Sequence, residues 1–127
     1  MKSMILLLCI SFVIPVFYVI YGTVLFIKEV PFLSPYGFVT LMSKKNKQVW
    51  DFANRKLGKK LVVLGIAEII ISLFMLLSVV IDPPQISAGE VLLITCSLEL
   101  FSFAVPAGRT VKLIERYFDA DGNSKDF

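Results

Sequence analysis

Histidine is absent from this chain of 127 residues, and cysteine occurs only twice, at Cys9 and Cys96. Without an imidazole, most hydrolase triads and most zinc sites cannot be built. Both cysteines lie in apolar runs, where we expect them to pack as small membrane residues and not as a secreted disulfide framework. The sequence also has no glycine-rich phosphate loop, metal-ligand cluster or nucleophile motif. We therefore expect neither an enzyme nor a bound cofactor or metal.

Charged residues are also scarce, at 18% of the chain, whereas 57% of the residues are hydrophobic. The mean hydropathy is +0.80. Soluble globular chains carry more charge and fewer apolar residues, and a soluble domain of this length has too little interior to hide so much apolar surface. We therefore predict an integral membrane protein with a single domain, residues 1–127, whose first partner is the lipid bilayer. Direct nucleic-acid binding is not expected.

Three apolar stretches predict three transmembrane helices, at about residues 4–27, 61–81 and 86–107. The first has too long an apolar region for a signal peptide and no small-residue cleavage site. Pro15 lies in its middle and predicts a kink. The third is the least hydrophobic and contains Pro106, but leaving it outside the membrane would expose long apolar runs. The predicted fold class is therefore an all-α integral membrane helical bundle.

The distribution of lysine and arginine predicts the orientation of these spans. The segment 28–60 is strongly basic, whereas the connector between the second and third spans has no Lys or Arg. Because basic loops stay in the cytoplasm, we predict a multi-pass cell-membrane protein with its N-terminus outside. The basic loop 28–60 and the tail 108–127 then face the cytoplasm.

The basic loop divides into two parts. Its first part contains Pro31, Pro35 and Gly37 and predicts an irregular interfacial segment, after which Ser43 can cap a helix. Within that helix an apolar stripe recurs at intervals of four residues. The stripe is compatible with a basic helix that lies at the interface of an anionic leaflet. Alternatively, the lysines of this segment only orient the protein in the membrane. No proline separates the helix from the second span, so the two could form one continuous helix. The stripe residues are Val49, Ala53 and Leu57.

The tail predicts a short helix, because Val111, Ile114 and Phe118 share one face. We interpret it as a cytoplasmic segment lying at the membrane surface. The following Asp119–Asn123 has the spacing of an EF-hand start. That match fails because Ser124 stands where glycine is required and the chain ends before the last ligand, so a polar helix stop is the better interpretation.

Two acidic residues, Glu68 and Glu99, interrupt the second and third spans. An intramembrane carboxylate costs roughly 2.5–3.5 kcal/mol to insert, so each needs a compensating environment. At 1.5 Å per residue both lie about 10–12 Å from the same boundary, and antiparallel spans can bring them to one depth. They either form a functional pair that shares a proton or holds a cation, or are protonated and hydrogen-bonded to Thr95, Ser97 or a carbonyl.

A spaced set of glycine, polar and aromatic residues runs through the basic loop into the second span, within residues 36–65. This pattern resembles the signature of the SdpI-type small bacterial membrane proteins, and the ending 118–123 resembles that of short family members. Val39 departs from the pattern, since the family usually carries Arg there, and Ala107–Gly108 stands where short members often have Thr-Glu. The matching residues are Gly37, Thr40, Asn46, Trp50, Ala53, Asn54, Gly58 and Lys59.

The resemblance implies an immunity protein that protects a bacterial cell against a secreted peptide toxin. It also implies an alternative, in which the protein sequesters a cytoplasmic transcription repressor by docking it on the helix 44–60. The two carboxylates suggest a third possibility, a small cation- or proton-coupled transport element. The oligomeric state is not predicted.

Overall fold

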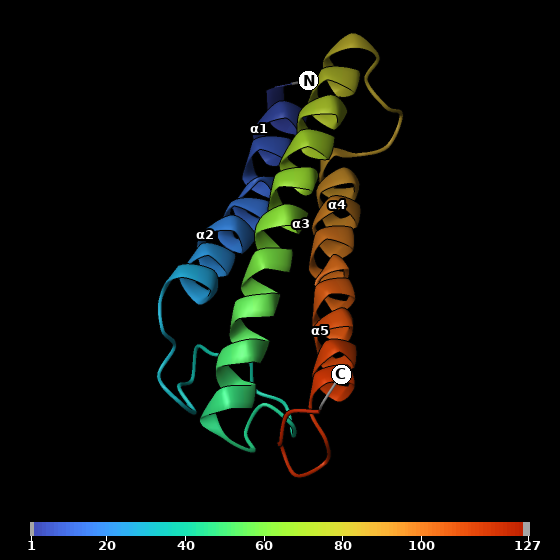
Figure 1. Cartoon of the computed structure of the whole chain (residues 1–127). Coiled ribbons are helices and arrows are strands. Elements are labelled where there is room, and N and C mark those ends of the chain that lie inside the picture. Colours follow the sequence, from blue (N-terminus) through green and yellow to red (C-terminus); the bar gives the residue numbers. More distant parts are fainter. Residues whose placement is uncertain (1, 126–127) are drawn as a thin grey trace.

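The computed structural model describes residues 2–125, so the ends of the predicted domain and tail, residues 1 and 126–127, lie outside the described residues. All regular structure in the described part is helical, which confirms the all-α class. Figure 1 shows three rods, of which the first and third are each made of two helices and the middle one is continuous. The helices are α1 (Lys2–Ser11), α2 (Val13–Ile27), α3 (Lys47–Ile81), α4 (Ala88–Ser102) and α5 (Ala104–Tyr117).

Each rod is long and apolar enough to cross a membrane: Lys2–Ile27, Lys47–Ile81 and Ala88–Tyr117. Large apolar side chains point outward from the bundle, as Phe101 shows with 77% of its surface exposed. Such outward-facing side chains suit lipid and not water. The chain is therefore a multi-pass membrane protein, and the third rod extends beyond the predicted end of its span.

The first and third rods are interrupted at equivalent points. The breaks fall at Phe12 and Phe103, each three residues before a proline, in the short repeats Ser-Phe-Val-Ile-Pro and Ser-Phe-Ala-Val-Pro. Proline has no N–H to offer the carbonyl four residues earlier, and its ring crowds that carbonyl. The first span is thus interrupted near Pro15, where a kink was predicted, and a second interruption precedes Pro106.

Helix α3 begins earlier than the second predicted span and is unbroken, so the basic helix and the span form one element. Its N-cap is Asn46, whose side chain accepts a hydrogen bond from the Val49 N–H at 2.9 Å. The predicted cap, Ser43, is wrong: its N–H bonds the hydroxyl of Thr40 at 3.0 Å within the preceding turn. Short polar side chains compete for the same local backbone N–H groups. Sequence alone does not show which of two nearby residues, Ser43 or Asn46, is the N-cap.

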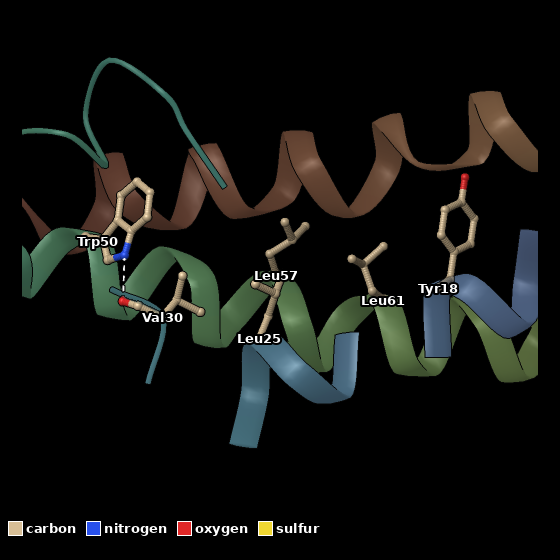
Figure 2. Close-up of a cluster of buried hydrophobic side chains, with 6 residues drawn as sticks. All are labelled: Tyr18, Leu25, Val30, Trp50, Leu57 and Leu61. Atoms are coloured by element: carbon tan, nitrogen blue, oxygen red, sulfur yellow. Dashed lines mark hydrogen bonds between the residues drawn. The ribbon is translucent and has the colours of Figure 1, made fainter. Parts of the chain in front are cut away.

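Glycines bring α2 and α3 into backbone contact. A Cβ on Gly58 would lie 2.6 Å from the carbonyl oxygen of Gly22, and a Cβ on Gly65 would lie 2.7 Å from that of Pro15. Small residues of this kind allow membrane helices to approach closely. Next to these contacts lies a buried cluster (Figure 2), which consists of Tyr18, Leu25, Val30, Trp50, Leu57 and Leu61.

The apolar stripe of α3 is covered by protein. Val49 and Ala53 have no exposed surface and pack against Ile114 and Phe118 at the end of the third rod. Leu57 belongs to the buried cluster of Figure 2. The interpretation of this stripe as a surface lying on a leaflet is therefore wrong, and the apolar face of the tail helix likewise points inward. Periodicity shows that a helix face is apolar, but not whether lipid or protein covers it.

Candidate functional site

Trp50 is the centre of the segment that carries the family resemblance. Its side chain has no exposed surface, and its indole N–H donates to the carbonyl of Val30 at 3.0 Å (Figure 2). The ring of Phe32 meets it edge-on at 5.8 Å between centroids. A Cβ on Gly37 would lie 2.3 Å from the indole ring, so only glycine fits there. Trp50 thus fastens the irregular loop to α3.

Asn54 fastens the same loop one turn further along α3. Its side-chain oxygen accepts from the N–H of Phe38 at 2.6 Å, while its amide donates to the Trp50 carbonyl at 2.9 Å. In the loop itself, the Thr40 N–H donates to the Ser43 hydroxyl at 2.7 Å. Buried polar side chains need such partners. The matched residues Thr40, Trp50 and Asn54 therefore have roles in holding the loop.

The two separate segments that carry the resemblance meet in space. The amide of Asn46 donates to the carbonyl of Gly122 in the tail at 2.9 Å. Gly122 has a φ of +85°, a left-handed conformation that favours glycine. The Asp119 carboxylate closes the same turn by accepting from the N–H groups of Asp121 and Asn123 at 3.0 and 2.9 Å. The Asp119–Asn123 turn therefore docks on the helix cap of α3.

The remaining matched residues lie on two sides of α3. Ala53 is buried against the tail, and Gly58 contacts α2. Lys59 is exposed and lines a cavity between α3 and α5. Val39, at the position where SdpI-type proteins usually carry Arg, is half exposed and offers no charge.

Lys47, at the start of α3, joins the loop to the helix by charge. Its ammonium contacts the carboxylates of Glu29 and of Asp51, the latter at 3.3 Å. The hydrogen bond and the positive charge of Lys47 hold the pKa of the Glu29 carboxyl below its usual value. The Lys47 and Glu29 side chains are mostly exposed to solvent and that of Asp51 is partly exposed, so these ion pairs contribute little to stability.

Glu68 and Glu99 lie at one depth between α3 and α4, with 8% and 6% of their surface exposed. Their hydrogen bonds are reciprocal. Ser102 on α4 donates to the Glu68 carboxylate, and Ser72 on α3 donates to that of Glu99 at 3.3 Å. These partners differ from the expected Thr95 and Ser97, because the rotation of a helix about its axis decides which hydroxyl faces the acid.

The break before Pro106 contributes to this site. In a regular helix the Glu99 carbonyl would accept from the N–H of Phe103, but that N–H turns to the carbonyl of Leu100 at 3.3 Å. The freed Glu99 carbonyl accepts instead from the hydroxyl of Tyr18 on α2 at 2.8 Å; Figure 2 shows this hydroxyl extended from α2 toward the third rod. Neighbouring hydroxyls commonly satisfy backbone carbonyls that lose their partner at a helix break in a membrane protein. All three rods therefore meet at the carboxylates.

Three buried oxygens in this cluster have no hydrogen-bond partner: one carboxylate oxygen each of Glu68 and Glu99, and the hydroxyl of Thr95. Within residues 2–125, the only salt bridges are those of Lys47, so no cation neutralises the pair. A buried polar atom without a partner costs about 1–3 kcal/mol. An unpartnered carboxylate oxygen can accept a proton or contact a cation.

In comparisons with known proteins, no family model, no curated protein and no solved structure matches the chain. The resemblance to SdpI-type proteins therefore rests on the matching residues alone.

Proposed function

We propose that this protein is a membrane immunity protein of the SdpI type, which protects a bacterial cell from a secreted peptide toxin. One observation supports the proposal most: the two segments that resemble the family, 36–65 and 118–123, are joined through the Asn46–Gly122 hydrogen bond. The hydrogen bond makes the two segments one structural unit at this end of the bundle. In this proposal the matching residues form the scaffold of one end of the bundle.

The proposed orientation follows from charge. The end that carries the loop 28–46 and the tail is strongly basic. At the opposite end (Figure 1), the connector 82–87 has no Lys or Arg, and the start of α1 adds the single cation Lys2, which the basic loop outnumbers. Basic ends are retained in the cytoplasm. A toxin arriving from outside would therefore meet the connector and the outer halves of the three rods first.

Thiol labelling tests this orientation with two matched variants, Gln48→Cys and Gln85→Cys, in a chain whose Cys9 and Cys96 are replaced by Ala. Both glutamines are exposed: Gln48 lies in the first turn of α3, and Gln85 lies in the connector beyond the other end of that helix. We expect a membrane-impermeant maleimide to label Gln85→Cys in intact cells, and Gln48→Cys only after permeabilisation. The reverse labelling pattern would contradict the proposed orientation. Labelling of both cysteine variants in intact cells would place residues 48 and 85 on the same side, and would contradict a single span between them.

A survival assay tests the immunity function. We expect a sensitive bacterium that expresses the chain to survive a purified peptide toxin of the kind that SdpI-type proteins resist, at doses that kill cells carrying the empty vector. Membrane levels are measured in parallel, and an unrelated membrane-lytic peptide serves as the specificity control. Equal killing with and without the protein, at a verified membrane level, would overturn the proposal.

A second candidate function is a proton- or cation-coupled membrane element. The specific observation that favours it is the reciprocal arrangement of Glu68 and Glu99 with Ser102 and Ser72, together with the unpartnered carboxylate oxygens. Ser102 lies within hydrogen-bond distance of both the Glu68 carboxylate and the Glu99 carbonyl. A hydroxyl carries one hydrogen, so when Ser102 donates to that carbonyl, its bond to Glu68 requires a proton on the carboxyl group.

A further inference from the structure

A cavity of about 460 Å³ opens between α3 and α5 at the basic end of the bundle. Its mouth is lined by cationic side chains, among them Lys59, Lys60 and Arg109. A neighbouring hollow of about 350 Å³ shares Lys60 and Arg109 and adds Lys112 and Arg116. The two hollows together form a continuous basic groove along the interface of these two helices, which we call the α3–α5 groove.

Among residues 2–125, no carboxylate forms a salt bridge with the cations of the α3–α5 groove. No acidic residue is among the described residues that line either hollow. The salt bridges found within residues 2–125 all belong to Lys47, which lies outside the groove. Like charges gathered without a counterion repel one another, and each lysine or arginine near an anionic lipid surface gains about 1 kcal/mol. The groove is therefore complementary to an anion.

The groove changes character along its length. On α3 the lining passes from Lys60 to Val63 and then Ala67, and on the antiparallel α5 it passes from Arg109 to Val105. Both walls thus turn from cationic to apolar in the same direction, away from the loop and toward the middle of the bundle. Seven residues separate Lys60 from Ala67, so the apolar part extends about 10 Å at 1.5 Å per residue. A free phosphate would use only the mouth, whereas an amphiphile would use both parts.

We propose that the α3–α5 groove is a binding site for an anionic phospholipid. The phosphate headgroup lies between Lys60 and Arg109, and an acyl chain lies along Val63, Ala67 and Val105. Basic pockets between membrane helices near the membrane boundary bind such headgroups. This inference is independent of the immunity function, because it rests only on the charges and shape of the groove.

The test measures lipid binding by the purified full-length protein with native mass spectrometry, using phosphatidylglycerol and phosphatidylcholine of matched acyl chains. We expect phosphatidylglycerol to bind more tightly. The double variant Lys60→Gln/Arg109→Gln should lose roughly 30-fold in affinity, which is the equivalent of about 1 kcal/mol for each of the two charges. The control variant Lys44→Gln/Lys45→Gln removes two exposed lysines outside the groove and should retain binding. Equal affinity for the two lipids, or an equal loss in the control, would overturn the proposal.

A second pair of variants distinguishes a lipid from free phosphate. Ala67→Phe fills the apolar part of the groove, and Ile66→Phe places the same ring on an exposed neighbour that does not line it. We expect Ala67→Phe to weaken phosphatidylglycerol binding and Ile66→Phe to leave it unchanged, while inorganic phosphate competes poorly with the lipid. A lipid affinity that is indifferent to Ala67→Phe, with full competition by phosphate, would assign the mouth to a phosphate ion and overturn the lipid site. Circular dichroism of each variant checks that the helices remain intact.

Discussion

Trp50→Ala should release the loop 28–46 from α3, so that trypsin cleaves the loop faster at Lys44 and Lys45, whose side chains are already exposed. The substitution removes a fully buried indole, deletes the hydrogen bond to the Val30 carbonyl and leaves a void beside Gly37. Replacing a buried tryptophan by alanine costs about 3–5 kcal/mol. Because each 1.4 kcal/mol is a factor of ten, cleavage through the open loop should accelerate roughly a hundredfold or more. The measurement is the rate of loop cleavage in the detergent-purified protein.

Two further variants separate the causes of this effect. Trp50→Phe keeps an aromatic ring but removes the indole N–H and part of the ring volume. It leaves the Val30 carbonyl unpaired, at a cost of about 1–3 kcal/mol, and should give an intermediate rate. Phe101→Ala removes an aromatic ring that is 77% exposed and should leave the cleavage rate unchanged. A wild-type cleavage rate in Trp50→Ala would show that this tryptophan does not hold the loop.

The features that sequence reasoning predicted well depend on length, composition and helix rise. A hydrocarbon core of about 30 Å requires a helix of about 20 apolar residues, and the three stretches satisfy that requirement. The shared depth of Glu68 and Glu99 follows from counting residues along rigid helices. The kink from Pro15 follows from its missing N–H. None of these predictions requires knowledge of which side chains face one another.

The features that sequence reasoning missed all depend on tertiary contacts. The stripe of Val49 and Ala53 is apolar whether lipid or the tail covers it, and only the fold shows that Ile114 and Phe118 do. The partner of Gly58 is Gly22 on another helix, and no motif joins the two. The carboxylates bond to Ser72 and Ser102 because of how α3 and α4 are rotated. One sequence feature does indicate part of this arrangement. The repeat Ser-Phe-x-x-Pro places a serine four residues before each proline, where the serine hydroxyl can donate to a backbone carbonyl at the helix break.

Glu68→Gln and Glu99→Gln should each abolish toxin protection, provided that the two acids act as a pair, while the protein still accumulates in the membrane. Glutamine retains an oxygen that can accept from Ser102 or Ser72, so the reciprocal contacts of the helices persist. What glutamine cannot do is bind or release a proton or neutralise a cation. A loss of function without a loss of protein would therefore assign the effect to the charge of the carboxylates.

The double variant Glu68→Gln/Glu99→Gln makes this prediction sharper. Groups that work as one unit are strongly non-additive, so the double change should cost little more than either single change. Glu90→Gln removes an exposed carboxylate at the start of α4 and is the matched control, with full protection expected. Survival under toxin challenge at matched membrane levels is the measurement for all four variants. Full protection by the double variant would mean that the carboxylates only join α3 to α4 through their hydrogen bonds, because an acceptor oxygen would then be all that the site requires.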